Sequence, residues 1–332
     1  MNVYHVVLTG GVGSRLWPLS RKSKPKQYLE IFNDQSLFEL AVERNQKLTN
    51  GLIVVGNKDN RELSLNSLHK MGVEDYGEVV EATPRNTAPA IAFSAFQAAP
   101  GDILLVTPAD HIIKADDSYE KAVSDAIQLA QSGAIVTFGV KPTRPETGYG
   151  YIESKGQDVI SFREKPNLET AKSFLHKGNF LWNSGMFCFK AGVFLEELKQ
   201  YEPKVYEASK KAFENAENGY LDEALSNEIP SISVDYAVME RSQHIQVVNA
   251  EFEWSDMGSF EAVYDYLKET GHPVDENGNM VIGANNFTAF VGLKDCIFVC
   301  TKDANLILSK EASQDVKGIY QELTDANSAL IQ

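Results

Sequence analysis

A short apolar strand pattern that runs directly into a glycine-rich loop stands at the start of this chain. Val3 to Leu8 is the apolar run, and glycines follow at positions 10, 11 and 13. Glycine leaves backbone N–H groups free to turn toward an anion, because no side chain blocks the approach. Five cationic side chains follow within twelve residues: Arg15, Arg21, Lys22, Lys24 and Lys26. The pattern predicts an α/β fold with a phosphate site at the end of its first strand.

Two familiar phosphate loops differ from this one. A dinucleotide-binding loop opens a helix directly and is followed about twenty residues later by an acid for the ribose. Here Trp17-Pro18-Leu19 and Pro25 interrupt any helix, and the following region is basic. A P-loop closes with Gly-Lys-Ser or Gly-Lys-Thr, which this loop lacks. We therefore expect a nucleoside triphosphate site of another kind, with a purely structural turn as the alternative.

The composition is that of an ordinary soluble globular protein. At 332 residues, the chain has room for one large domain and a smaller one. Its net charge of −15 argues against nucleic-acid binding, which requires a basic surface to neutralise the phosphates. The same charge repels a phosphorylated ligand, so a local cluster of cations or a metal must reverse the field around it.

The cysteines and the hydropathy exclude several other classes. Cys188, Cys296 and Cys300 cannot form a disulfide framework, and the last two have no nearby histidine to complete a zinc site. We expect all three to be buried apolar residues. No apolar run approaches the roughly twenty residues of a membrane helix, and the first residues carry no export pattern. We expect a cytoplasmic protein with no membrane partner.

Strand-like and helix-like segments alternate from Val3 to Val140, which is typical of a parallel sheet covered on both faces. The strands of this region are predicted at Tyr4–Leu8, Leu52–Val55, Glu78–Glu81, Ile103–Val106 and Ala134–Gly139. Paired strands are predicted at Tyr149–Glu153 and Asp158–Glu164. We expect an α/β domain over residues 1–270 with a Rossmann-like, mostly parallel mixed sheet flanked by helices.

A smaller unit is predicted over residues 271–332. Short strands separated by turn residues are expected at Met280–Ile282, Ala289–Val291, Ile297–Val299 and Leu306–Leu308, followed by a helix near Ser313–Leu323. Such a β-rich appendage can pack onto the large domain or form a dimer contact, and its composition does not decide between these.

Helix starts in the large domain carry local signals. Ser36-Leu37-Phe38-Glu39 forms a capping box for a helix that reaches about Leu48. Asn86 or Thr87 can cap a helix that runs through Ala98. Two further helices are predicted at Leu168–Lys177 and Ala191–Tyr201.

Two acids follow strand-like runs far apart in the chain. Asp110 comes after the strand Ile103–Val106, and Asp256 after a run from His244 to Phe252. Ligands of open α/β folds bind at the carboxyl edge of the sheet, and two carboxylates with phosphate oxygens and water suit Mg²⁺. A helix or turn cap is the alternative for both, with Asp256 or Ser259 starting the next helix.

A third acid, Glu81, ends the predicted third strand before Thr83-Pro84-Arg85-Asn86-Thr87. Its carboxylate could accept from the N1–H and 2-amino groups of guanine, a pairing that adenine cannot offer. A helix N-cap with a proline in the first turn is the alternative for this segment.

Polar groups in the second half of the domain suit a sugar phosphate. Glu164 and Lys165 follow a strand, and they suit sugar hydroxyls and a phosphate respectively. A surface Glu–Lys pair on a hairpin is the alternative. Asn183 is a polar residue in an apolar stretch, and Asp235 could be only an acid at a helix start.

The joint order of these motifs resembles the sugar-1-phosphate nucleotidylyltransferases, in the branch that joins mannose 1-phosphate to a guanine nucleotide. The matching pieces span roughly residues 5 to 260. They are the loop from Leu8 to Leu19 with Pro25-Lys26-Gln27, Arg85-Asn86-Thr87-Ala88-Pro89-Ala90-Ile91, Pro108-Ala109-Asp110-His111, Glu146-Thr147-Gly148-Tyr149-Gly150-Tyr151-Ile152, Phe162-Arg163-Glu164-Lys165-Pro166, Trp182-Asn183-Ser184-Gly185-Met186-Phe187, Ser233-Val234-Asp235-Tyr236 and Trp254-Ser255-Asp256-Met257-Gly258.

The resemblance implies that mannose 1-phosphate attacks the α-phosphate of GTP in line, giving GDP-mannose and pyrophosphate. It implies Mg²⁺ held by Asp110 and Asp256, with Arg15 and Lys26 stabilising the developing charge and the leaving pyrophosphate. The residues expected at the nucleotide are Leu8, Gly10, Gly11, Gly13, Ser14, Glu81, Arg85, Asn86 and Ala88. Those expected at the sugar phosphate are Gly148, Glu164, Lys165, Asn183 and Asp235, the last in a supporting role.

The sequence differs from the family pattern in two ways, and three other functions are compatible with it. Glu81-Ala82 stands where the family usually has Glu-Pro, and longer relatives continue into a phosphomannose isomerase domain, so we do not expect that second activity. The rivals are a nucleotidylyltransferase for a manno-heptose phosphate with GTP, one for glucose 1-phosphate with UTP, and a non-catalytic sugar-nucleotide sensor. A homodimer is possible on this sequence.

Overall fold

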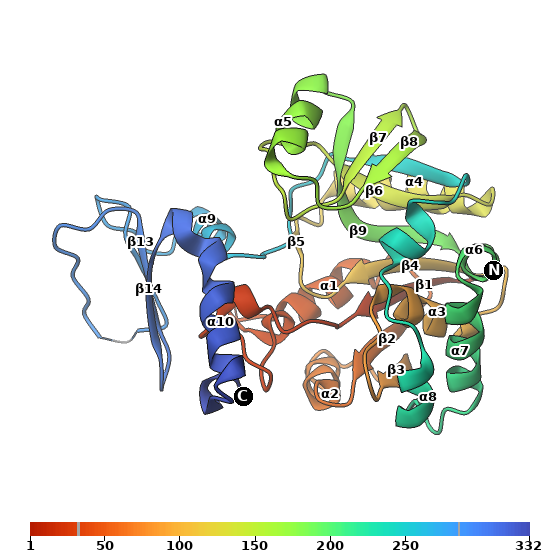
Figure 1. The fold of residues 1–332 in the computed structure, drawn as a ribbon, viewed down its shortest axis with the longest axis horizontal. Helices are drawn as coiled ribbons and strands as arrows, with labels where there is room; N and C mark the ends of the chain where they lie inside the picture. Colours follow the sequence, from red (N-terminus) through yellow and green to blue (C-terminus); the bar gives the residue numbers. More distant parts are fainter. Residues whose placement is uncertain (32–33, 285) are drawn as a thin grey trace.

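A nine-stranded mixed sheet forms the centre of the computed structural model, which describes residues 1–31, 34–284 and 286–332 (Figure 1). The order across the sheet is β3-β2-β1-β4-β9-β6-β10-β8-β7. Its strands are β1 (Val3–Leu8), β2 (Gly51–Asn57), β3 (Gly77–Glu81), β4 (Ile103–Pro108), β6 (Ile135–Val140), β7 (Tyr151–Lys155), β8 (Asp158–Arg163), β9 (Phe180–Lys190) and β10 (Ile245–Ala250).

The predicted α/β alternation is confirmed, with one long strand inserted into it. Strands β3, β2, β1 and β4 are neighbours and run parallel. Strand β9 pairs antiparallel with both β4 and β6, so β6 keeps the direction of the first four strands but is separated from them. Because β9 comes late in the chain and reverses direction, it joins the two halves of the large domain into one sheet.

Helices cover both faces of the sheet because neighbouring residues of each strand point to opposite sides. On β1, Val6 packs in one core cluster and Val7 in another. One face is covered by α1 (Leu37–Asn45), α2 (Arg61–Lys70) and α4 (Asp117–Gln131). The other is covered by α3 (Thr87–Gln97), α6 (Ala191–Tyr201) and α7 (Pro203–Glu214).

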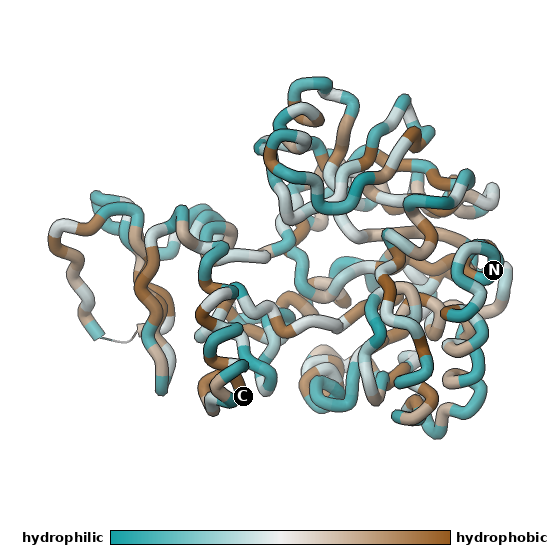
Figure 2. Tube along the Cα trace, viewed as in Figure 1, coloured by the Kyte–Doolittle hydropathy of each residue, from teal (hydrophilic) through white to brown (hydrophobic). Residues whose placement is uncertain are grey.

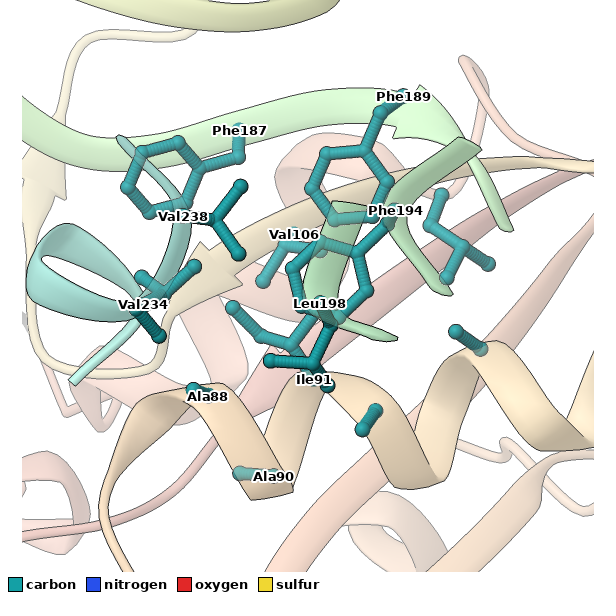
Figure 3. Packing of buried hydrophobic residues seen from close by; sticks show 14 of the residues in the cluster. Ala88, Ala90, Ile91, Val106, Phe187, Phe189, Phe194, Leu198, Val234 and Val238 are labelled. Atoms are coloured by element: carbon teal, nitrogen blue, oxygen red, sulfur yellow. The ribbon is translucent and has the colours of Figure 1, made fainter. Parts of the chain in front are cut away.

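Helix α3 lies at the centre of the larger core cluster. In Figure 3, Ala88, Ala90 and Ile91 lie along this helix, below aromatic and aliphatic side chains from β9, α6 and the segment near residue 235. Ala88 and Ile91 are fully buried. Small residues at the start of α3 therefore let the segment before residue 235 of the same chain approach the first turn of the helix closely.

The remaining elements are short or flank the sheet. They are η1 (Ser14–Leu16), η2 (Lys26–Tyr28), β5 (Ile112–Ile113), α5 (Leu168–Lys177), α8 (Glu223–Glu228), the π-helical turn η3 (Asp235–Met239), β11 (Trp254–Ser255) and α9 (Phe260–Glu269). Strand β11 pairs with β5, which brings the segment before α9 next to the segment after β4. That pairing sets the two predicted metal-binding acids close to the same edge of the sheet.

A three-stranded sheet and a final helix follow α9 (blue in Figure 1), and we use the predicted bounds, residues 271–332, for this C-terminal unit. Its elements are β12 (Met280–Ile282), β13 (Cys296–Cys300), β14 (Asn305–Ser309), η4 (Lys310–Asp315), α10 (Val316–Asp325) and η5 (Ala329–Ile331). One face of this sheet packs with Phe260 of α9 and with Leu16 of η1 in a single core cluster. The unit therefore packs onto the large domain.

Two predictions for this unit were wrong. Residues Ala289–Val291 form no strand, and Val291 is 90% exposed in a loop. Of the three cysteines, Cys188 is buried, but Cys296 and Cys300 are only half-buried. The reason is the two-residue period of β13: Ile297 and Val299 face the core, so the cysteines face the other side.

The hydropathy pattern follows these layers. Figure 2 shows hydrophobic segments along the strands of both sheets and hydrophilic segments on the outer helices and turns. Within the described ranges, no helix is long and apolar enough to cross a membrane.

Candidate active site

A cleft of about 510 Å³ lies at the carboxyl ends of β1, β3 and β4, facing the β7–β8 hairpin and β9. Parallel strands present their carboxyl ends at one edge, where open α/β sheets bind ligands. Twelve of the predicted site residues line this cleft: Leu8, Gly10, Gly11, Glu81, Asn86, Asp110, Gly148, Glu164, Lys165, Asn183, Asp235 and Asp256. Segments up to about 250 residues apart in the chain therefore meet in one space.

The other predicted residues lie around the cleft rather than on its wall. Gly13, Ser14 and Arg15 belong to the loop and to η1, and Lys26 lies directly behind Asp110. Arg85 donates from Nε to the Ile229 carbonyl at 2.6 Å. Ala88 is buried in the core, and its N–H donates to the Ile232 carbonyl at 3.3 Å. We find the side chains of Arg85 and Ala88 engaged in the fold itself.

A larger cavity, about 1140 Å³, lies between α9 and the β6–β9 region. It shares Tyr149 and Trp254 with the cleft, but none of the predicted site residues line it. The chemistry-bearing side chains converge on the smaller space, so we take that cleft as the candidate active site.

Lys26 connects the two acids. Its side chain is 7% exposed, and its Nζ lies 2.8 Å from Asp110 Oδ2. The same Nζ donates to the backbone carbonyl of Asp256 at 2.6 Å. Gly13, at a φ of +76°, has no side chain to obstruct it: a Cβ there would lie 2.5 Å from Cβ of Lys26. The loop glycine thus makes room for the lysine stem.

Asp110 remains ionised although it is partly buried. Burial acts to raise the pKa of this carboxyl, but the charge of Lys26 and the hydrogen bonds that the carboxylate accepts outweigh that effect and lower it. His111 Nε2 lies 3.7 Å from Asp110 Oδ1, and Trp254 Nε1 donates to His111 Nδ1 at 3.2 Å. Burial lowers the pKa of His111, so its ring is neutral at pH 7 and carries the proton on Nε2, toward Asp110.

Asp256 is held by hydrogen bonds and does not cap α9. The cap is Ser259, whose hydroxyl accepts from Ala262 N. Asp256 Oδ1 accepts from the Tyr149 hydroxyl at 2.7 Å and from Gly258 N at 3.1 Å. The capping alternative for Asp256 is therefore wrong, and its carboxylate is oriented in the cleft by Tyr149.

Three positioning residues were missed from the sequence alone. Tyr149 orients Asp256, and Trp254 orients His111. Gln27 donates to the Thr9 carbonyl at 2.7 Å and to the Gly11 carbonyl at 3.3 Å, which fixes the glycine loop. All three lie inside motifs that the sequence singled out, but their partners are distant in the chain or are backbone groups.

Glu81 lies at the other end of the cleft, and its side chain is almost fully buried. Among the described residues no cation pairs with its carboxylate, whose one polar contact is with Arg85 N at 3.5 Å. Burial is the main cause that raises the pKa of Glu81 from 4.5 to about 7. The N-cap of α3 is Asn86, which accepts from Thr87 N at 2.9 Å, and Pro89 lies in the first turn, so the capping alternative for this segment is confirmed while Glu81 itself lines the cleft.

Asn86 holds a backbone conformation that ordinary residues rarely adopt. Its φ is +76° and its ψ is −179°, a region that is nearly restricted to glycine and costs about 1–3 kcal/mol. The first turn of α3 is fixed from outside: Thr87 Oγ1 accepts from Val234 N at 2.9 Å. Strain held in this way at a cleft wall is typical of a binding site.

Where β9 and η3 border the cleft, an acid, an amide and a hydroxyl form a connected network. Asn183 Nδ2 donates to Asp235 Oδ1 at 3.0 Å, and Thr137 donates to Asn183 Oδ1 at 3.1 Å. Burial, then the nearby charge of Glu164, raises the pKa of Asp235 to about 6. Asp235 orients Asn183 in this arrangement.

The predicted Glu–Lys pair is also present there. Lys165 Nζ lies 2.9 Å from Glu164 Oε1, with side-chain exposures of 62% and 9%. The pair follows a hairpin, as the alternative interpretation required, but Glu164 is buried against the cleft and Lys165 lines it. The Gly148 N–H donates to Glu146 Oε1 at 3.0 Å.

The donor set of Asp110 and Asp256 fits a magnesium ion. Mg²⁺ in phosphate-transfer sites binds one or two carboxylates and takes its other oxygens from phosphates and water. Within the described ranges, no group of three or more His, Cys, Asp and Glu side chains could hold a metal by itself. The two acids therefore match a site that is completed by a phosphorylated substrate.

Comparison with known proteins agrees with this geometry. The family model for nucleotidyl transferases matches residues 4–272. The chain belongs to the nucleotidyl transferase family. It is an enzyme of this family, a sugar-1-phosphate nucleotidyltransferase, and the resemblance noted from its motifs is confirmed. Residues 273–323 match a second model, the mannose-phosphate isomerase/GMP-like β-helix domain.

Three curated relatives match nearly the whole chain. A mannose-1-phosphate guanylyltransferase of Escherichia coli K12 is 38% identical over 97% of this chain and 73% of its own length. The xanthan biosynthesis protein XanB of Xanthomonas campestris is 37% identical over 98% of this chain and 74% of its own. The alginate biosynthesis protein AlgA of Pseudomonas putida is 38% identical over 96% and 71%.

Solved structures show the same fold. A Thermus thermophilus protein, described as mannose-1-phosphate geranyltransferase, is 28% identical with a TM-score of 0.84, covering 98% of this chain and 100% of that one. A Helicobacter pylori protein, described as mannose-6-phosphate isomerase, is 38% identical with a TM-score of 0.69, covering 77% and 100%. The predicted fold class is therefore confirmed over both parts of the chain.

Proposed function

We propose that this nucleotidyl transferase transfers GMP from GTP to α-D-mannose 1-phosphate, giving GDP-mannose and pyrophosphate in a reaction that requires Mg²⁺. The observation that carries the proposal is the convergence of Glu81, Asp110, Glu164 and Asp256 on one cleft behind a glycine loop. Relatives at 37–38% identity that bear the name mannose-1-phosphate guanylyltransferase support the choice of substrates.

The difficulty of the reaction is electrostatic. A phosphomonoester dianion must approach a triphosphate, and each like-charge pair at ~4 Å costs about 4 kcal/mol at a near-surface dielectric. Asp110 and Asp256 would hold the magnesium ion, whose positive charge would offset this repulsion and polarise the α-phosphate. The protein itself supplies Arg15, which lies in η1 directly after the glycine loop, and Lys26, whose stem lies against Gly13.

The chain positions the reactants at two ends of the cleft. Gly10 and Gly11 offer backbone N–H groups to the phosphates, since both line the cleft just after β1. Lys165 would hold the phosphate of mannose 1-phosphate, with Glu164 and Asn183 on the sugar hydroxyls. Because little covalent work is required of the protein, positioning of this kind supplies most of the rate.

Lys26 has a second role in this scheme. Its contacts with the Asp110 carboxylate and with the Asp256 carbonyl keep the two acid-bearing segments together before substrates bind. The Lys26 ammonium, which lies beside the two acids, would stabilise the negative charge that develops on the departing pyrophosphate.

Glu81 would select the base. An ionised carboxylate accepts from both the N1–H and the 2-amino group of guanine, whereas adenine presents an acceptor at N1. The buried position of Glu81 makes an unmatched base costly, because a buried polar group would be left without a partner.

A pyrophosphate-release assay over a matrix of nucleotides and sugar phosphates tests the proposal. The expected result is the highest kcat/KM with GTP and mannose 1-phosphate, and no turnover after chelation of divalent metal. Higher kcat/KM with a heptose phosphate, or with UTP and glucose 1-phosphate, would contradict the proposed substrates. Absence of turnover with every pair would favour a sugar-nucleotide sensor.

A further inference from the structure

The segment that follows the glycine loop lies between the catalytic cleft and the C-terminal unit. Figure 1 shows α10 beside the N-terminal part of the chain, next to η1. Leu16 is fully buried and Trp17 is 6% exposed, and both belong to the core cluster that also contains Val316 of α10. The residues directly after Arg15 are therefore anchored in the C-terminal unit rather than in the large sheet.

Backbone groups at the end of the chain bind this segment directly. Trp17 Nε1 donates to the Leu330 carbonyl at 3.0 Å. Lys22 N donates to the Ile331 carbonyl at 3.0 Å. Two donors of the loop segment are thus satisfied by residues more than 300 positions away.

A bidentate ion pair adds a third link. Arg21 Nη1 and Nη2 donate to the two carboxylate oxygens of Asp303 at 2.8 and 2.5 Å. The Arg21 side chain is 14% exposed, and its Nε also donates to the Pro18 carbonyl at 3.2 Å. A guanidinium that bridges Asp303 and Pro18 fixes the turn after η1, because its donors form a rigid fork.

Arg15 depends on this anchoring. Within the described part of the chain, its side chain makes no hydrogen bond or ion pair, and its Nε is buried without a partner. Among the described residues no polar contact holds the guanidinium, so its position follows from the backbone of η1 and from the packing around the side chain. Lys26, in contrast, is fixed by its own bonds to Asp110 and Asp256.

We propose that the C-terminal unit is a positioning element of the active site: through the Arg21–Asp303 pair and the Trp17–Leu330 bond it holds η1 so that Arg15 meets the pyrophosphate end of the nucleotide. This inference rests on the proposed function. Arg21 and Asp303 are positioning residues, since both act through Arg15 and neither lines the cleft.

The KM for pyrophosphate in the reverse reaction, with GDP-mannose, is the measurement that tests this positioning. Asp303→Asn in the full chain removes the ion pair between Arg21 and Asp303. We expect the KM for pyrophosphate to rise about tenfold, because small misplacements of a catalytic group cost one to two orders of magnitude. The KM for GDP-mannose should change by less than about twofold. Asp303→Glu keeps the charge and should restore most of the affinity.

Two comparisons separate positioning from a general loss of structure. Asp265→Asn breaks the Lys310–Asp265 pair, 2.6 Å long, which joins the same C-terminal unit to α9 away from the loop. It should leave the KM for pyrophosphate unchanged. In an Arg15→Ala background, Asp303→Asn should have no further effect on that KM, because the two changes then act through one missing group.

Three results would overturn the proposal. One is an unchanged KM for pyrophosphate in Asp303→Asn. Another is an equal rise in Asp265→Asn, and the third is an additive rise in the Arg15→Ala background. If the wild-type enzyme makes no GDP-mannose at all, the substrates proposed above are wrong. That outcome is distinct from all three.

Discussion

Each end of the cleft holds one carboxylate, which is buried in Glu81 and 29% exposed in Asp110, and the two carboxylates differ in charge state. Asp110 lies beside Lys26, and its pKa is lowered although burial opposes this. Glu81 has no cation beside it in the described part of the chain, and burial raises its pKa to about 7. A buried acid therefore stays ionised only where the fold supplies a countercharge.

The difference matches what each end would bind. Under the proposed function, the Asp110 end would bind a cation and phosphates, so an ionised acid held by a lysine is suited to it. The Glu81 end would accept hydrogen bonds from a neutral base, and an acid near its midpoint ionises readily when donors approach. We infer that charge is fixed at the phosphate end and is adjustable at the base end.

The largest effect is expected at the fixed-charge end. Asp256→Asn should lower kcat by about a thousandfold or more, because one oxygen ligand of the metal loses its charge. Asparagine can still accept from Tyr149 and Gly258, so the melting temperature should stay close to that of the wild type. Glu253→Gln, at a neighbouring exposed acid, is the matched control. Near-normal Mg²⁺-dependent activity would remove Asp256 from the metal.

Removal of the lysine is expected to have the next largest effect. Lys26→Ala should lower kcat about a hundredfold with little change in the KM for GTP, because its charge is needed most as pyrophosphate departs. Lys24→Ala, two residues away and exposed, serves as the control. Equal losses in kcat and in GTP affinity would show that Lys26 only binds the nucleotide.

A change at the base end should be smaller and should alter specificity. Glu81→Gln should lower kcat/KM for GTP about ten- to a hundredfold, since a buried donor then faces the donors of guanine. It should raise the ratio of ATP to GTP turnover, because an amide can pair with adenine. Glu78→Gln on the same strand, which pairs with Arg61, is the control. Unchanged base preference would place Glu81 away from guanine.

The smallest expected effect is a dependence of the KM for GTP on pH, caused by Glu81. With a pKa of about 7, Glu81 is mostly protonated at pH 6 and mostly ionised at pH 8, so the KM for GTP should fall about tenfold between them. The dependence should vanish in Glu81→Gln.

Since folding raises this pKa above 4.5, the stability that Glu81 contributes is present at low pH and is lost as the pH rises through 7.

Much of the fold could be predicted from local patterns. Helices α5 and α6 begin and end at the predicted residues, and the capping box at Ser36 and Glu39 is present. These features depend on neighbouring residues and on periodicity, which the sequence displays directly. The loop at Ala289–Val291 was mistaken for a strand because a short apolar run has no partner information in it.

Site residues divide in the same way. The acids after strand ends could be predicted, since parallel strands bring their carboxyl ends to one edge. The hydroxyl of Tyr149 on Asp256, and the Lys26 bond to a carbonyl 230 residues away, could not. No spacing rule in the sequence relates such distant pairs.

The amino-acid sequence by itself determined the order of strands and helices, the glycine turn and the type of chemistry, because each follows from the backbone preferences and charges of adjacent residues. The tertiary structure decided that β9 separates β4 from β6, that Glu81 lacks a cation while Asp110 has one, and that the end of the chain anchors the loop beside Arg15. These outcomes depend on which distant surfaces pack together, and burial and electrostatic energies are set only by that packing.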